Sequence, residues 1–197
     1  ISSPSGGGKT SLINKLFEDS RSTNFEKSIS DTSRQKREGD LEGKDYYFLT
    51  EKDFKDKIKK EEYVEYATVF GNFYGTSKEE IKTKYNNSNL ILELDWQGAY
   101  AVKELFDDAK LIFLVPPSLD DLKQRLIKRN LDSSEAIENR LSEAKKEISK
   151  SEMYDYLVLN DDFDKAFEDL SQILFEGISP IDFKSRASKD LIKRLVE

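Results

Sequence analysis

Residues 1–11 read Ile1-Ser-Ser-Pro-Ser-Gly-Gly-Gly-Lys-Thr-Ser11, and they are the most informative part of the chain. From Ser3 they match the pattern of a phosphate-binding loop, with serine in place of the usual first glycine. The three glycines can adopt positive φ, so that successive backbone N–H groups point at one anion. Residues 10–17 are amphipathic and predict a helix whose N-terminus lies behind that anion. Lys9 can then reach the β- and γ-phosphates of a nucleotide, and the Thr10 hydroxyl can bind Mg²⁺.

A phosphate-binding loop requires a buried strand before it, and only Ile1 of such a strand is present. We therefore expect that the sequence starts inside the first strand, with earlier residues missing. The simpler alternative is a glycine-rich turn before an ordinary helix. The run Gly-Gly-Gly-Lys-Thr-Ser before an apolar helix is specific enough to favour the phosphate-binding loop.

The composition limits the possible functions. At 197 residues the chain is one domain, with room for mobile sub-lobes. It has no cysteine and no histidine, which excludes disulfides, cysteine-ligated zinc and any imidazole acid, base or metal ligand. The net charge of −7 argues against a surface that coats nucleic acid, so we expect no nucleic-acid partner. No apolar run is long enough to span a membrane, and we expect a cytoplasmic protein.

The order of the predicted elements indicates an α/β fold with a mostly parallel sheet, because strands alternate with helices. Strands are expected at 25–30, 63–70, 90–95, 111–115 and 156–159, and helices at 10–17, 50–60, 97–106, 119–129, 135–149 and 162–174. A further helix is expected after Thr76 or Ser77, and residues 71–75 are interpreted as a turn. Ligands of such folds lie beyond the carboxyl ends of the strands, where the loop and Asp95 both fall.

Five of the eight arginines gather in two segments. Arg34 and Arg37 lie three apart in a polar stretch, whereas Arg125 and Arg129 share a helix face and Arg140 follows on the next helix. Because the chain is rich in lysine, an arginine indicates a position where a planar guanidinium is needed and a lysine ammonium would not suffice. The simpler alternatives are a solvated charged turn and a helical hairpin whose acids pair the arginines.

Together these pieces resemble the guanylate kinase family, of the bacterial type, from about Ile1 to Leu174. The resemblance rests on several motifs in the right order and spacing. They are the loop at 3–10, Ser30-Asp-Thr-Ser-Arg-Gln-Lys-Arg-Glu-Gly39, Gly43-Lys-Asp-Tyr-Tyr-Phe48, Gly71-Asn-Phe-Tyr-Gly-Thr-Ser77, Glu93-Leu-Asp-Trp-Gln-Gly98, Pro116-Pro-Ser118, residues 125–129 and Leu159-Asn-Asp-Asp162.

The resemblance implies an enzyme that transfers the γ-phosphate of ATP to GMP, giving ADP and GDP, with Mg²⁺ as cofactor. It also implies a P-loop fold with a three-layer parallel-sheet core, an inserted GMP-binding lobe and a helical lid. The core would comprise residues 1–29, 87–117 and 147–197, the lobe residues 30–86 and the lid residues 118–146. ATP and GMP would be the partners of a monomer or homodimer.

In the lobe, the resemblance places the GMP phosphate on Arg34, Arg37, Tyr46 and Tyr74. Guanidinium forks can neutralise a dianion, and tyrosine hydroxyls add directed donors. The guanine base would be bound by Ser30, Glu65 and Thr76, while Asp95 would serve either the nucleotide or the metal through water. A carboxylate such as Glu65 can accept from N1–H and from the exocyclic amine of guanine, neither of which adenine offers.

For ATP, the resemblance implies binding by Ser5, Gly6, Gly7, Gly8, Lys9, Thr10, Ser11, Arg125 and Asn160, with Mg²⁺ on Thr10. The catalytic residues would be Lys9, Arg34, Arg129 and Arg140, of which Lys9 and the two lid arginines stabilise charge on the transferred phosphoryl group. No general base is needed, because the attacking phosphate oxygen of GMP is already ionised, with a second pKa of about 6. The lack of histidine is compatible with this reaction.

Three positions depart from the common family pattern. Ser3, Lys36 and Asn130 stand where glycine, proline and glycine are usual. None of these changes removes a charge that the mechanism needs, although Asn130 can alter the flexibility of the lid.

Two alternatives stay open: a guanylate-kinase-like binding module that has lost catalysis, and another nucleoside monophosphate kinase or small P-loop NTPase. The intact run Gly8-Lys9-Thr10 argues against the binding module, whose loop is typically degraded. Glu65 and the pair Arg34 and Arg37 argue against a different substrate. The sequence assigns no function to the tail at 178–197.

Overall fold

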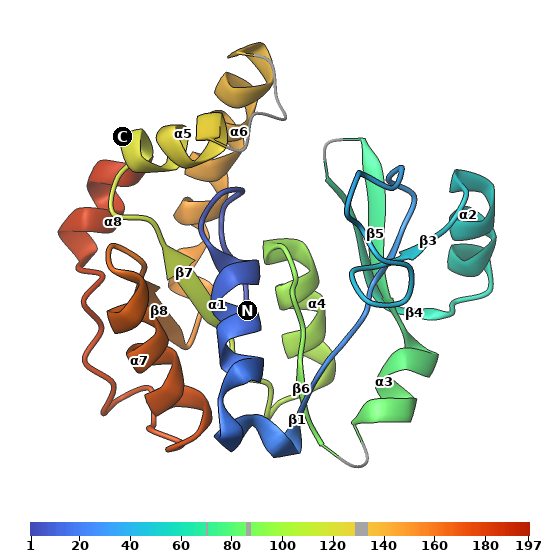
Figure 1. The fold of residues 1–197 in the computed structure, drawn as a ribbon, viewed down its shortest axis with the longest axis horizontal. Coiled ribbons are helices and arrows are strands. Elements are labelled where there is room, and N and C mark those ends of the chain that lie inside the picture. Colours follow the sequence, from blue (N-terminus) through green and yellow to red (C-terminus); the bar gives the residue numbers. More distant parts are fainter. Residues whose placement is uncertain (70, 86–87, 129–133) are drawn as a thin grey trace. The chain divides into compact units, whose positions relative to one another are not determined.

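The structure is a computed structural model that describes residues 1–69, 71–85, 88–128 and 134–197. These residues form two compact units, each with its own strands and helices (Figure 1). The first unit comprises residues 1–22 and 110–197, and the second comprises residues 23–109. A 3₁₀ helix at Ser20–Asn24 spans the boundary between them.

The first unit is built on two parallel strands, β7 (Ile112–Val115) and β8 (Tyr156–Leu159). Ser2 pairs with Phe113 on the other edge of β7, through hydrogen bonds of 2.9 Å to Ile112 O and from Leu114 N. The helices of this unit are α1 (Lys9–Glu18), α5 (Leu119–Lys128), α6 (Ser134–Ser149), α7 (Phe163–Leu174) and α8 (Lys189–Val196), with a 3₁₀ turn at Ser151–Met153. The loop at residues 3–8 therefore connects a strand-like residue to α1.

The apolar core of the first unit lies where β7 and β8 meet α1 and α7. Its buried side chains are Leu12, Ile112, Leu114, Tyr156, Val158, Ala166, Leu170, Ile173 and Phe183. Full burial of one large aliphatic side chain contributes about 1.5–3 kcal/mol, so Leu12 anchors α1 firmly behind the loop. All four residues of β7 are buried, as expected for a parallel strand covered on both faces.

The second unit contains two sheets. β1 (Phe25–Lys27) and β6 (Asn89–Ile91) form a parallel pair. The other sheet has the order β3 (Tyr47–Phe48), β2 (Asp31–Thr32), β5 (Asn72–Ser77) and β4 (Tyr63–Val69), with antiparallel pairing of β5 to both neighbours. The helices are α2 (Glu51–Lys59), α3 (Lys78–Lys84) and α4 (Trp96–Leu105).

The predicted α/β class is confirmed, and several predicted boundaries agree within one residue, such as β8 and α7. Three predictions are wrong. The expected strand at 25–30 ends at Lys27 as β1. The expected turn at 71–75 is mostly strand, because residues 72–77 pair with β4 as β5. The expected strand at 90–95 ends at Ile91, and Asp95 instead caps α4 by accepting from Gly98 N at 2.8 Å.

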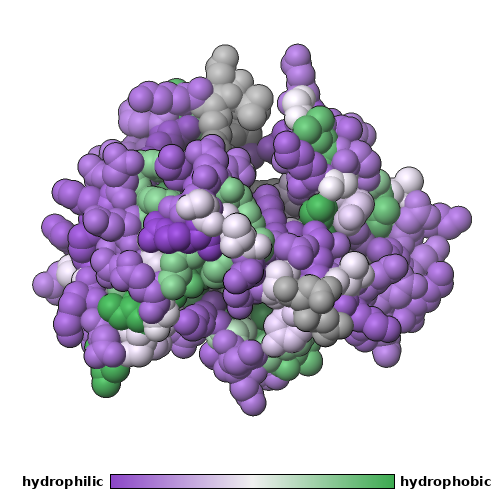
Figure 2. Space-filling model, turned by 60° about the horizontal axis from the view of Figure 1, so that its bottom comes forward, coloured by the Kyte–Doolittle hydropathy of each residue, from purple (hydrophilic) through white to green (hydrophobic). Residues whose placement is uncertain are grey.

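No helix in the described ranges has the length and apolar character needed to cross a bilayer. Hydrophilic residues cover most of the face drawn in Figure 2, and apolar residues form small groups between them. This surface agrees with the high proportion of charged residues, 36%.

Candidate functional site

The glycine-rich loop of the first unit has the backbone geometry that a phosphate-binding loop needs. Gly6 and Gly8 have φ of +84° and +91°, and Gly8 is the N-cap of α1. The amide of Gly7 donates to Pro4 O at 2.8 Å. A Cβ on Gly8 would lie 2.3 Å from Asn160 Nδ2, and one on Gly7 would lie 2.9 Å from Pro4 O. Glycine is therefore required here both for positive φ and for close approach.

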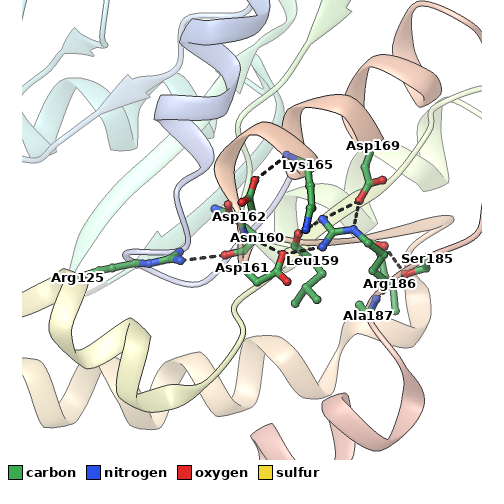
Figure 3. Close-up of polar contacts among 11 residues, drawn as sticks. Arg125, Leu159, Asn160, Asp161, Asp162, Lys165, Asp169, Ser185, Arg186 and Ala187 are labelled. Carbon is green, nitrogen blue, oxygen red and sulfur yellow. Dashed lines mark hydrogen bonds and ion pairs between the residues drawn. The ribbon is translucent and has the colours of Figure 1, made fainter.

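Polar side chains from distant parts of the first unit hold this loop. The Asn160 amide Nδ2 donates to Gly7 O at 2.7 Å, and Asn160 O accepts from Arg125 Nη2 at 2.9 Å (Figure 3). Arg140 Nη1 donates to Ser5 Oγ at 2.7 Å. The structure thus brings together five of the residues predicted for ATP and catalysis. Arg129, also predicted, lies outside the described residues.

The residues predicted to bind the transferred phosphoryl group and the metal begin α1. Lys9 is partly exposed, and the side chains of Thr10 and Ser11 are exposed in the first turn of the helix. No group of three acidic side chains that would form an all-protein metal cage occurs in the described part of the chain. A single hydroxyl next to a phosphate site fits Mg²⁺, which keeps several waters and binds phosphate oxygens.

A buried carboxylate dominates the predicted base site of the second unit. Glu65 on β4 is 6% exposed and lies opposite Thr76 on β5 in the strand register. Because α4 packs against β4, the start of this helix faces the carboxylate. A Cβ on Gly98 would lie only 2.6 Å from Glu65 Oε2, and Gly98 N donates to Asp95 Oδ1 at 2.8 Å.

Burial raises the pKa of the Glu65 carboxyl to about 7. The nearby polar groups of Thr76 work against this rise, and the negative charge of Asp95 adds to it. The site therefore holds a carboxylate that its own surroundings stabilise poorly when it is charged. A bound group with two N–H donors would stabilise the charged carboxylate by hydrogen bonds.

The residues predicted for the GMP phosphate gather at one end of the four-stranded sheet. Thr32 on β2 pairs with Tyr74 on β5, and Asp31 pairs with Tyr47 on β3, so the segments that follow β2 and precede β3 lie near Tyr74. The ring of Tyr46 lies 5.8 Å from that of Tyr74 in an edge arrangement. Ser30, which precedes β2, accepts from Tyr47 N through its carbonyl at 3.0 Å.

Arg34 lies over the rings of Tyr46 and Phe48. Its Cζ is 5.3 Å from the centroid of the Tyr46 ring, and its Nη2 contacts Asp40 Oδ2 at 2.9 Å. Burial raises the pKa of Tyr46 to about 12, so this hydroxyl stays protonated and can donate. Arg37 joins the group through its backbone amide, which donates to Asp40 Oδ2 at 2.8 Å, while its side chain is exposed.

Sequence reasoning missed Asp40 and Gly98. Asp40 contacts both Arg34 and Arg37. Burial raises its pKa, but the hydrogen bonds from Arg37 and Arg34 outweigh burial and lower it. An acid three residues after Arg37 was the available signal for Asp40. For Gly98 the only signal was a glycine in the first turn of a helix, which costs helix stability and so suggests a close approach.

Comparison with known proteins gives one consistent result. The family model described as guanylate kinase matches residues 1–177. The chain belongs to the guanylate kinase family. Its relatives include the guanylate kinase of Wolbachia sp. subsp. Brugia malayi (strain TRS), 47% identical over 176 residues that cover 88% of this chain and 89% of that protein. The guanylate kinase of Hahella chejuensis is 47% identical over 174 residues, with 88% and 83% covered.

The fold agrees with that of a solved guanylate kinase. The crystal structure of guanylate kinase from Anaplasma phagocytophilum matches with a TM-score of 0.72 and 33% identity, covering all of this chain and 93% of that one. The family predicted from the motifs is thereby confirmed, as is the P-loop kinase class of the fold. The roles of the individual site residues stay predictions.

Proposed function

We propose that this protein is an ATP:GMP phosphotransferase, which moves the γ-phosphoryl group of ATP to GMP and yields ADP and GDP. Membership of the guanylate kinase family supports the reaction, and the curated relatives are named guanylate kinases. The single observation that carries the choice of GMP is the Glu65 carboxylate on β4, which is 6% exposed and whose pKa is raised by that burial.

We propose that guanine binds at Glu65. Its carboxylate accepts from N1–H and the exocyclic amine, while hydroxyls of Ser30 and Thr76 donate to the base. Asp95 braces the start of α4 against this site and lies close enough to Glu65 to raise its pKa. Adenine offers no such pair of donors, so binding it would leave the carboxylate unpaired in a buried site.

The GMP phosphate is proposed to bind Arg34, Arg37, Tyr46 and Tyr74. Before GMP arrives, Asp40 supplies the anion that keeps the Arg34 guanidinium in place over the Tyr46 ring. A phosphate dianion is a stronger partner for the guanidinium than one carboxylate oxygen. Substrate binding therefore exchanges one anion for another rather than ordering a free side chain.

On the ATP side, the amides of the phosphate-binding loop, Ser5 to Gly8, with Ser11 at the start of α1, cradle the phosphates, and Lys9 contacts the transferred group. Thr10 would hold Mg²⁺, which when bound neutralises phosphate charge. Arg140, together with Arg129 and Arg34, completes the cationic surround of the reacting group. Asn160 lies beside the loop and donates to Gly7 O, and Arg125 donates to Asn160 O.

The reaction needs positioning and charge neutralisation rather than a base. An ionised phosphate oxygen of GMP forms the new bond to the γ-phosphorus, and the bond from that phosphorus to the β–γ bridging oxygen breaks, so that ADP leaves with the electron pair. We propose that residues 30–86 form the GMP-binding lobe and residues 118–146 a lid on a core of residues 1–29, 87–117 and 147–197. Closure of both would exclude water.

A coupled assay of ADP production tests this function. Wild-type protein with ATP, Mg²⁺ and each of GMP, AMP, CMP and UMP should turn over GMP with the highest kcat/KM by at least about 100-fold. Preference for AMP would contradict the assignment of Glu65, and no turnover with any nucleotide would favour the inactive binding module. Oligomeric state and a cytoplasmic location stay predictions.

A further inference from the structure

The C-terminal tail is folded onto the first unit, although residues 178–197 lie beyond the part matched by the family model. Tyr156 Oη on β8 donates to Ile178 O at 2.7 Å, and the buried ring of Phe183 packs edge-on against Tyr156 at 5.7 Å. Farther along, α8 packs against α6. The tail is therefore a structural part of the unit that carries the phosphate-binding loop.

Two tail residues bind the outer edge of β8. Tyr156 N donates to Leu111 O, just before β7, and Asn160 N donates to Val115 O in β7. Alternate residues of a strand point to opposite edges, so the carbonyls of Leu157 and Leu159 face away from β7. Ser185 Oγ donates to Leu157 O at 2.5 Å, and Arg186 Nη2 donates to Leu159 O at 2.8 Å (Figure 3). These side chains satisfy carbonyls that lack a neighbouring strand.

Arg186 extends this contact to the loop after β8 and to α7. Its Nη1 contacts Asp161 Oδ1 at 2.6 Å, and its Nε contacts Asp169 Oδ2 at 3.2 Å. The hydrogen bond from Arg186 lowers the pKa of Asp161, so this acid stays ionised and paired near neutral pH. A planar guanidinium can bind three acceptors in fixed directions, which a lysine ammonium cannot do.

Asn160 lies between the two residues that Arg186 holds. Its side chain is buried, with 4% exposure, and donates to Gly7 O in the phosphate-binding loop at 2.7 Å. Gly8 lies so close to the Asn160 amide that a Cβ on Gly8 would clash with Asn160 Nδ2. A small shift of Asn160 would therefore move the backbone that cradles the phosphates.

We propose that Arg186 is a positioning residue for the ATP site. By holding the residues on both sides of Asn160, it fixes the Asn160 amide against the phosphate-binding loop, and the C-terminal tail thereby sets the affinity for ATP. This inference rests on the proposed function, in which the loop binds ATP. Arg186 itself contacts no substrate in this account, so its effect must show in ATP binding and not in GMP binding.

The test is steady-state kinetics of the full chain, with ATP and GMP varied in turn. Arg186→Ala should raise KM for ATP about tenfold and leave KM for GMP within about twofold, because the misplacement is confined to the loop. Arg186→Lys keeps a charge near Asp161 but loses the fork, and should give an intermediate KM for ATP. The matched control is Lys193→Ala, which removes an exposed ion pair to Glu197 on α8 and should change neither constant.

Two results would overturn the proposal: an unchanged KM for ATP in a folded Arg186→Ala variant, or equal increases for both substrates. If Arg186→Ala does not fold, Asp161→Asn removes the charge of one of the two acids that pair with Arg186. This variant should give a smaller rise in KM for ATP, and no rise would also contradict the proposal. Wild-type protein that fails to phosphorylate GMP would overturn the proposed function instead. Calorimetric titration with ATP of wild type and Arg186→Ala then still decides the role of Arg186.

Discussion

Glu65→Gln should stabilise the fold while weakening GMP binding. The pKa of Glu65 is about 7 in the folded protein, against 4.5 for a solvated glutamate. The folded chain keeps this proton up to about pH 7, whereas the unfolded chain releases it near pH 4.5. Between these values the folded state binds more protons than the unfolded state, so stability falls as the pH rises. Above pH 7 the whole cost of burying the charge is present.

The size of the effect follows from the difference of about 2.5 between the two pKa values. A difference of one pKa unit corresponds to about 1.4 kcal/mol. Ionisation of Glu65 therefore lowers the free energy of unfolding by about 3 kcal/mol at pH 8 and by less than about 1 kcal/mol at pH 5. Glutamine carries no charge at either pH. The difference in unfolding free energy between variant and wild type should therefore be larger at pH 8 than at pH 5 by about 2.5 kcal/mol, and effects of shape cancel in this comparison.

Urea denaturation can measure this difference through the single tryptophan. Trp96 begins α4 in the same unit as Glu65, so its fluorescence reports the unfolding of the relevant part of the chain. Glu79→Gln is the control, because it removes an exposed carboxylate from α3 in that unit. A Glu65→Gln variant whose stability relative to wild type is the same at pH 5 and pH 8 would refute the account of a poorly stabilised buried carboxylate.

The same pKa predicts how GMP binding depends on pH. Between pH 8 and pH 6 the ionised fraction of Glu65 falls from about 90% to about 10%, so the affinity of wild type for GMP should fall about tenfold. Protonation of the GMP phosphate adds up to about twofold to this loss. In Glu65→Gln the affinity should be weak at both pH values and lose only the phosphate contribution, as isothermal titration calorimetry can show.

Three further substitutions test the two sites. Lys9→Met should lower kcat about 100-fold or more while the dissociation constant for GMP, measured by calorimetry, stays within about threefold; near-normal turnover would remove Lys9 from the reaction. Gly8→Ala forces a Cβ to within 2.3 Å of Asn160 Nδ2 at a φ of +91°, and should raise KM for ATP far more than KM for GMP. Gly98→Ala places a Cβ 2.6 Å from Glu65 Oε2 and should raise KM for GMP far more than KM for ATP. If both alanine variants raised the two KM values equally, the assignments would be contradicted.

Elements with local signals were predictable from the sequence. The glycines before α1, the cap at Thr50, which accepts from Asp53 N at 3.1 Å, and the apolar run of β8 each report on a few neighbouring residues. The prediction of a turn at 71–75 was wrong because glycine occurs both in turns and in strands that need close packing. Gly75 lies within β5, where a Cβ would come within 3.0 Å of Glu65 O and of two tyrosine side chains on β4. It permits close strand pairing rather than a turn.

The parts of the sites that the sequence did not predict depend on contacts between distant residues. Gly98 follows Glu65 by 33 positions, and Arg186 follows Asp161 by 25. Local sequence periodicity cannot predict either contact, because it reports only on neighbouring residues. It also does not distinguish a buried glutamate from an exposed one. The raised pKa of Glu65 comes from burial by α4, which only the folded arrangement shows.

A crystal structure with GMP bound would test the central claim most directly. We predict that the guanine N1–H and exocyclic amine contact the Glu65 carboxylate, and that the phosphate binds Arg34 in place of Asp40. GMP bound anywhere else, or with its base turned away from Glu65, would contradict the account.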